Sequence, residues 1–267
     1  MRRRGSCSTA RRLTRPLRTA RAPGSRAIRS ESYGLESYSP YQDRDLTDYA
    51  VFDAGDQELC FGDASLALKD LRERAAEVAG DGKIPFMLGG EHLVTLAPVQ
   101  ALAEKYPDLH IIHFDAHADL RDDYLGAKLS HACVLRRWEV LEDGRITQFG
   151  IRSGDREEWR WGKEHVTTHP FIVDMEVLQE TLRKLEGKPV YFTLDLDVLD
   201  PSVFPGTGTP EPGGISFEEL RRAVTQICSA ARIVGCDVNE LSPALDASGA
   251  STAVACKIVR EMLLALL

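Results

Sequence analysis

From about residue 60 to its end, the sequence alternates apolar runs of strand length with longer segments in which apolar residues recur at helical spacing. The expected strands are 83–90, 109–117, 146–153, 189–200 and 232–241, and the expected helices are 64–80, 92–106, 130–143, 175–187, 216–231 and 248–267. Strands joined by helices of this length need right-handed crossover connections, which produce a parallel sheet covered on both faces. Because there is neither a repeat nor a linker, we predict a single α/β domain whose parallel β-sheet is flanked by helices on both faces.

The composition and charge of the 267 residues exclude several classes of function. No apolar run approaches the roughly 18 residues that a membrane-spanning helix needs, so we expect no membrane partner. The six cysteines are scattered without a CxxC pair, which argues against a zinc knuckle or a disulfide scaffold and favours the reducing cytoplasm. The net charge is −8, and the chain after residue 30 is more acidic still. We therefore expect no nucleic-acid partner, and a chain suited to cationic substrates or metal ions.

The apolar run 109–112 continues into the sequence HFDAHADL, which places three ionisable side chains at the end of an expected strand. Side chains at positions i, i+2 and i+4 of an extended segment point the same way, so Asp115, His117 and Asp119 leave one face together. A surface strand could carry such residues by chance. Three ionisable groups in register at the end of an apolar strand nevertheless indicate a metal site.

Three other strand ends carry polar residues of the same kind. The sequence GGEH supplies His92, TLDLDVLD supplies Asp195 and Asp197, and GCDVNELSP supplies Glu240. Ligands of open parallel sheets bind outside the carboxyl ends of the strands, so these side chains are expected to meet. Two imidazoles and four aspartates form a mixed N/O set suited to Mn²⁺, Fe²⁺ or Zn²⁺. Because six ligands exceed the need of one ion, we predict two ions about 3.5–4 Å apart that activate water as a nucleophile.

Three motifs of the chain resemble the ureohydrolases, the family of arginase and agmatinase. They are GGEH, IIHFDAHAD and TLDLDVLDPSVFPGTGTPEPGG, and the resemblance runs from about Arg26 to the end of the chain. The segments LESYSPYQDRDL, LSHACVLRR and FGIRSG are more similar to bacterial agmatinases than to arginases. The resemblance implies the three-layer α/β/α architecture shared by arginases and deacetylases. It also implies hydrolysis of a guanidino group, two Mn²⁺ ions per subunit and a homo-oligomer, either a trimer or a hexamer.

The resemblance further implies a role for each residue that matches the motifs. The metal ligands would be His92, Asp115, His117, Asp119, Asp195 and Asp197. Asp119 would also orient the bridging hydroxide, Glu240 would bind the guanidinium group, and His131 would carry a proton to the leaving amine. Each residue also has a structural interpretation. The two aspartates of TLDLDVLD could be solvated strand-end residues, His131 a capping or core residue, and Glu240 a salt-bridge partner.

The loop after DAHAD, with the sequence LRDDYLGAKLS, bears on the substrate. Arginases bind the substrate carboxylate with an Asn- and Ser-containing loop, whereas this chain has Arg121 in place of the Asn, followed by Asp122, Asp123 and Tyr124. Acidic groups there favour a second cation, such as the free amine of agmatine, whose hydrolysis gives urea and putrescine for polyamine biosynthesis. Arg121 has the opposite effect and keeps guanidinobutyrate and other guanidino acids open as alternatives.

The first 25 residues depart from the family pattern. Residues 1–30 contain ten arginines and no acidic residue, and the apolar strand with which relatives usually begin is absent. We therefore divide the chain into an atypical Arg-rich segment, 1–25, and a ureohydrolase domain, 26–267. A shifted reading frame or misassigned start is the favoured explanation, and a targeting peptide is the second. A missing strand would leave an expected strand at 48–55 without a neighbour, and would give a less stable protein with impaired activity.

Two rival functions belong to other classes. One is a deacetylase on the same fold, which would use a single zinc ion. The other is a non-catalytic relative that has lost activity with the N-terminal strand. The amount of bound metal per chain separates the first rival from a two-ion hydrolase.

Overall fold

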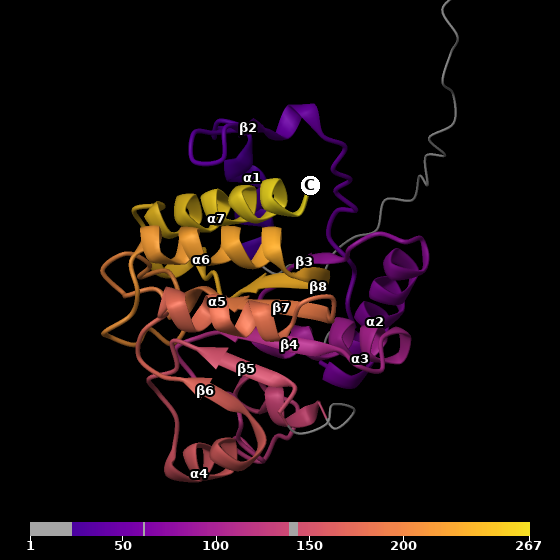
Figure 1. Ribbon diagram of the computed structural model, residues 1–267, viewed down its shortest axis with the longest axis vertical. Coiled ribbons are helices and arrows are strands. Elements are labelled where there is room, and N and C mark those ends of the chain that lie inside the picture. The colour runs from indigo at the N-terminus through magenta and orange to yellow at the C-terminus, as the bar shows by residue number, and fades with distance from the viewer. Residues whose placement is uncertain (1–22, 61, 139–143) are drawn as a thin grey trace, which may run out of the picture.

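The computed structural model describes residues 23–60, 62–138 and 144–267 of the chain. Within these residues, a six-stranded parallel sheet with the order β3-β8-β7-β4-β5-β6 forms the centre of the molecule (Figure 1). Its strands are β3 (Phe86–Leu88), β4 (His110–Phe114), β5 (Ile146–Phe149), β6 (Thr167–His169), β7 (Pro189–Asp195) and β8 (Arg232–Asn239). The predicted parallel sheet is confirmed.

Helices cover both faces of this sheet (Figure 1). They are α1 (Pro23–Ser32), α2 (Ala64–Gly80), α3 (Leu96–Lys105), α4 (Arg156–His165), α5 (Met175–Lys184), α6 (Phe217–Ala230) and α7 (Ala250–Leu266). Buried side chains of α1, α5, α6 and α7 form one hydrophobic core with Ile112 and Phe192 of the central strands. Those of α2 and α3 form a second core with Ile111 and Tyr191. Because neighbouring strand residues point to opposite faces, β4 and β7 supply both cores, and the predicted three-layer arrangement is confirmed.

The expected helix at 130–143 is wrong for the residues that the structure describes. In its place are two 3₁₀ turns, η3 (His131–Cys133) and η4 (Leu135–Arg137), while residues 139–143 lie outside the described part. The backbone N–H of Leu135 donates to the carbonyl of Asp119 instead of to His131, and the carbonyl of Ala132 accepts from the N–H of Arg121. The hydrogen bonds that would build a helix are therefore used to hold the loop after DAHAD.

Helix α4 and strand β6 were not expected from the sequence. The helix is very polar and begins with a capping box, in which the side chains of Asp155 and Glu158 each accept the backbone N–H of the other residue. Its two tryptophans, Trp159 and Trp161, pack against the second core. Two anchoring aromatic side chains and a cap thus stabilise a helix whose apolar pattern is too sparse to predict it.

The N-terminal part differs from expectation as well. The expected strand at 48–55 is wrong: η1 (Leu46–Asp48) is followed by a segment without regular structure, in which the Asp53 carboxylate lies 2.9 Å from Arg29 Nε of α1. A short antiparallel pair, β1 (Tyr38–Ser39) and β2 (Arg44–Asp45), lies apart from the main sheet (Figure 1). Of the predicted segment 1–25, residues 1–22 lie outside the described part, and the last three begin α1.

Among the residues that the structure describes, no helix is both long enough and apolar enough to span a membrane.

Candidate metal centre

The four predicted strand ends meet at the carboxyl edge of the sheet, because β3, β8, β7 and β4 are consecutive neighbours. Asp115 follows β4 directly, Asp195 is the last residue of β7, and Glu240 follows β8 directly. His92 begins a 3₁₀ turn, η2 (His92–Thr95), after the glycine pair that ends β3. Side chains far apart in the sequence are therefore brought to one place by the strand order alone.

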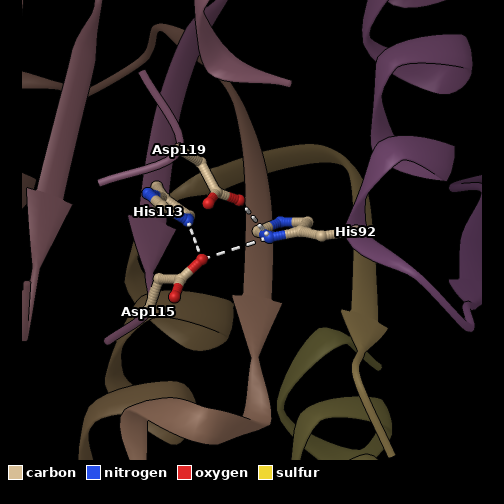
Figure 2. A group of neighbouring side chains, drawn as sticks. All are labelled: His92, His113, Asp115 and Asp119. Carbon is tan, nitrogen blue, oxygen red and sulfur yellow. Dashed lines mark hydrogen bonds and ion pairs between the residues drawn. The ribbon is translucent and has the colours of Figure 1, made fainter. Parts of the chain in front are cut away.

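The first group consists of the imidazole of His92 and the carboxylates of Asp115, Asp119 and Asp195 around it; Figure 2 draws all of these except Asp195. The Nδ1 atom of His92 lies 3.1 Å from Asp115 Oδ2, 3.1 Å from Asp119 Oδ2 and 3.4 Å from Asp195 Oδ2. All four side chains are buried. The Nδ1 atom is buried too, and no described residue makes a well-formed hydrogen bond to it. An imidazole nitrogen without such a bond, facing three carboxylates, has the arrangement of ligands around a cation.

The second group adjoins the first and shares a residue with it. His117 Nδ1 lies 2.9 Å from Asp197 Oδ2 and 3.5 Å from Asp115 Oδ1. The ligand atoms of Asp115, His117 and Asp197 all lie within 4.8 Å of one another, as do those of His92, His113, Asp115 and Asp119. Asp115 belongs to both groups, with one oxygen turned toward each. Two adjoining groups that share a carboxylate fit a pair of metal ions.

The tautomer of His92 supports this fit. The hydroxyl of Thr193 donates its hydrogen to Asp237 Oδ1 at 2.7 Å, and Thr193 Oγ1 lies 2.9 Å from His92 Nε2. Because that hydrogen is used, the threonine oxygen accepts from the Nε2–H of His92. The lone pair of a neutral His92 is then on Nδ1 and faces the carboxylates, as a metal ligand requires.

The electrostatics of the two groups favour the binding of a cation. Burial, together with the charge of Asp115, raises the pKa of Asp119 to about 7. Burial and the neighbouring aspartates raise the pKa of Asp195 well above its ordinary value. Burial alone would raise the pKa of Asp115 too, but hydrogen bonds donated by His113 and His117 hold it well below its usual range. Carboxylates packed this closely in a dry site repel one another, and a divalent ion would remove that repulsion.

Two of the predicted site residues have a backbone conformation that is unusual for their type. Asp119 and Glu240 have φ angles of 54° and 65°, in the left-handed region that side-chain-bearing residues seldom occupy. Glu240 is held there by two hydrogen bonds of 2.8 Å, from its own N–H to the Gly90 carbonyl and from the His92 N–H to its Oε1. Burial raises the pKa of Glu240. The chain thus accepts backbone strain to place both carboxylates at the site.

His131 lies at the rim, outside the two groups. Its Nδ1 is 3.0 Å from Glu91 Oε1, and its backbone N–H donates to the same oxygen at 2.7 Å. The hydrogen bond that His131 donates to the Glu91 carboxylate raises the pKa of His131. The side chain is 37% exposed, and the ring of Tyr124 contacts it edge-on. A half-exposed imidazole with a raised pKa can deliver a proton to a group bound at the rim.

Sequence reasoning missed Glu91 and His113. Glu91 precedes the ligand candidate His92 in GGEH, but nothing in the sequence indicates that it faces His131 across 40 residues. His113 is buried, with Nε2 2.9 Å from Asp115 Oδ2. The alternation that selected Asp115 and His117 applies equally to His113 two positions earlier, so a signal for it was present.

The fold and the site together define a class: a three-layer α/β/α protein with a buried cluster of carboxylates and imidazoles at the carboxyl edge of its sheet. The model of the arginase family matches residues 13–265 of the chain. An agmatinase of Bacillus subtilis is 47% identical over 248 residues, which cover 91% of this chain and 86% of that protein. The chain belongs to the arginase family. The resemblance drawn from the GGEH, IIHFDAHAD and TLDLDVLD motifs is thereby confirmed.

Two further relatives bear on fold and substrate. A crystal structure of a Clostridium difficile protein superimposes with a TM-score of 0.87 at 47% identity, covering 91% of this chain and 89% of that one. A guanidinobutyrase of Pseudomonas aeruginosa is 30% identical over 265 residues, covering 92% of this chain and 81% of that protein. The family thus includes relatives named for different guanidino substrates.

Proposed function

We propose that the protein is an agmatinase. It would cleave agmatine with water to give putrescine and urea, a step of polyamine biosynthesis. The observation that carries this proposal is the 47% identity to an agmatinase over nine-tenths of the chain. The two adjoining groups of carboxylates and imidazoles support it, because a two-ion hydrolase needs two neighbouring sets of metal ligands.

The cofactor of this proposal is a pair of Mn²⁺ ions per subunit. His92, Asp115, Asp119 and Asp195 surround the first position, and Asp115, His117 and Asp197 surround the second. When bound, the two ions would lower the pKa of water and so supply a nucleophile at neutral pH. Mn²⁺ suits a ligand set of imidazole nitrogen and carboxylate oxygen, and ion analysis of the purified protein would test this choice.

The remaining roles belong to the side chains of the chain itself. Asp119 accepts a hydrogen bond from the attacking water and orients it. Glu240, with one oxygen held by the His92 N–H, binds the guanidinium group through charge-assisted hydrogen bonds. As the carbon–nitrogen bond of the substrate breaks, His131 gives a proton to the leaving amine nitrogen. Urea and the amine product then leave the site.

The second candidate is a guanidinobutyrase, or another guanidino-acid ureohydrolase, and it is favoured by the 30% identity to such an enzyme and by Arg121. The environment of Arg121 argues for agmatine instead. Its Nε lies 3.1 Å from the buried carboxylate of Glu158 and 3.7 Å from Asp155, so its charge is compensated within the protein. An arginine engaged in this way is a poor receptor for a substrate carboxylate.

Several further expectations are part of the same proposal. The protein is a cytoplasmic homo-oligomer, a trimer or a hexamer, and large exposed aromatic side chains such as Tyr33 and Phe52 offer apolar surface for subunit contacts. The division into an Arg-rich segment, 1–25, and a ureohydrolase domain, 26–267, is retained as a division by composition. Light scattering of the purified protein would test the oligomer.

Urea release tests the proposed function. The purified protein, loaded with Mn²⁺, is assayed on agmatine, arginine and guanidinobutyrate in parallel. Preferential release of urea from agmatine is the expected result, and preference for another of the three would change the substrate. No urea from any, in a protein that binds two Mn²⁺ per chain, would indicate the impaired relative instead. One zinc ion per chain and no urea would favour the deacetylase.

A further inference from the structure

His113 is the third imidazole of the cluster, and neither the motifs nor the proposed mechanism gives it a task. It lies on β4 beside Asp115, with its side chain completely buried (Figure 2). Its Nε2 atom is 2.9 Å from Asp115 Oδ2, and its ring centre is 5.2 Å from that of His92. This position allows two roles. His113 could be an additional metal ligand, or it could be a hydrogen-bond donor that fixes Asp115.

The amide of Gln148, on the neighbouring strand β5, decides between these roles. Its Nε2 lies 2.8 Å from the carbonyl of Ala118 and 3.1 Å from His113 Nδ1, and its Oε1 accepts from the hydroxyl of Thr168 at 3.0 Å. A backbone carbonyl can only accept hydrogen bonds, so the amide nitrogen must face Ala118. The second amide hydrogen then points at Nδ1 of His113, which has to be the acceptor.

The tautomer of His113 follows from this bond. A neutral imidazole carries one hydrogen, and with Nδ1 as the acceptor that hydrogen is on Nε2. The Nε2–H therefore points at Asp115 Oδ2 and cannot at the same time offer a lone pair to a metal ion. The other oxygen of Asp115 is fixed as well, because Oδ1 accepts the backbone N–H of His117 at 2.6 Å.

We propose that His113 is a positioning residue for the metal centre: it holds the carboxylate that both ions share, and Gln148 sets its tautomer. The chain of hydrogen bonds runs within the sheet from the half-buried Thr168 through Gln148 and His113 to Asp115, and the last three side chains are buried. With one donor on each oxygen, the plane of the Asp115 carboxylate is fixed, and the remaining lone pairs point toward the two groups. The inference rests on the proposed two-ion centre.

Substitution of His113 tests the hydrogen bond directly. In His113→Phe the ring volume is kept and the donor is lost, so Mn²⁺ affinity, measured by calorimetry on the metal-free protein, should fall about 10- to 100-fold for both ions. In His113→Gln an amide N–H can again reach Asp115, and most of the affinity should return. His110→Phe is the matched control, because His110 begins the same strand beside Lys188, far from the carboxyl edge, and its affinity should stay that of the wild type. Wild-type affinity in His113→Phe would overturn the proposal.

Substitution of Gln148 distinguishes the two roles by the sign of the effect. In Gln148→Glu a carboxylate replaces the amide, so it accepts from Nδ1–H and moves the lone pair of His113 to Nε2. A positioning donor is thereby lost, and Mn²⁺ affinity should fall as in His113→Phe. If His113 were instead a ligand, the new carboxylate would strengthen it and the affinity would rise. Thermal melts of the metal-free variants show whether each still folds.

A spectroscopic readout separates failure of this inference from failure of the proposed function. The ¹⁵N chemical shifts of the imidazole of His113 in the metal-free protein report which nitrogen carries the hydrogen. The hydrogen on Nε2 is expected, and a hydrogen on Nδ1 would overturn the proposal whatever the metal content. A wild-type protein that binds no Mn²⁺ would contradict the two-ion centre, and with it any role of His113 in positioning metal ligands.

Discussion

The buried cluster and the rim above it adjoin in the sequence and in space, yet they are built differently. In the cluster, Asp115 is completely buried, follows a central strand directly and has a donor on each oxygen. At the rim, the side chains of Arg121 and His131 are 33% and 37% exposed and depend on pairings with acidic partners from other elements. This difference indicates that the sheet fixes the positions of the candidate metal ligands, whereas proton delivery and substrate choice depend on the loop after DAHAD. The two regions should therefore respond differently to substitution.

The largest effect should come from the cluster. Removal of bound metal with a chelator should abolish urea release, because the nucleophile is lost, and Mn²⁺ should restore it. It should also lower the free energy of unfolding, by about 2.7 kcal/mol for each ion whose free concentration had stood at 100 times its dissociation constant. Activity and melting temperature are measured before and after chelation.

Asp115→Asn should have an effect similar to chelation, because Asp115 belongs to both groups and its loss weakens the binding of both ions. Activity should fall by more than about 100-fold, since even changes in the outer partners of metal ligands cost about 10- to 100-fold. Asp81→Asn, in the exposed turn between α2 and β3 at the opposite edge of the sheet, removes the same charge and should retain activity. Full activity in Asp115→Asn would show that the shared carboxylate is not a ligand.

The next effect should come from the rim without any change in the cluster. His131→Asn removes the proposed proton donor, and kcat should fall about 10²- to 10⁴-fold, the usual contribution of a general acid. Because His131 contacts Glu91 and not the ligands, the two Mn²⁺ ions per chain should remain bound. Loss of bound metal in this variant would contradict the prediction that His131 acts independently of the metal-binding cluster. Metal analysis and steady-state kinetics are measured on the same preparation.

The same division explains what the sequence could and could not predict. The apolar strands and the spacing of Asp115, His117 and Asp119 are local, and strand order brings distant ends together, so the parallel sheet and the meeting of these side chains at its carboxyl edge were predictable. Helix α4 was missed because packing of tryptophans and a capping box, instead of apolar spacing, stabilise it. The 3₁₀ turns in place of the helix at 130–143 result from backbone bonds to Asp119 and Arg121, which no local pattern encodes. Likewise, the Glu158–Arg121 pairing spans 37 residues and joins two elements.

That pairing gives a test of substrate choice at the rim. Glu158→Gln leaves Arg121 with less compensation of its charge, and the preference for guanidinobutyrate relative to agmatine, measured as the ratio of kcat/KM values, should rise about two- to fivefold. Glu157→Gln, one residue away on the exposed side of α4 and paired with Arg160, is the matched control and should leave the ratio unchanged. An equal change of this ratio in both variants would mean that the overall charge of the protein, and not Arg121, sets the substrate preference.

The smallest effect should be a shift of the pH profile by Glu91→Gln. The hydrogen bond that His131 donates to the Glu91 carboxylate raises the pKa of His131, and His131 must be protonated to donate to the leaving amine. The protonated form is lost as pH rises through this pKa, so the alkaline limb of kcat should move to lower pH in Glu91→Gln. The rate on the acid side of the limb should change little, because the amide oxygen can still accept the His131 backbone N–H. The same sign applies to stability: a raised pKa stabilises the fold at low pH, and this contribution is lost as pH rises. Because the side chains of Glu91 and His131 are both partly exposed, this contribution to stability is small, and the pH profile of kcat is the more sensitive measurement. A limb that stays in place would mean that another group delivers the proton.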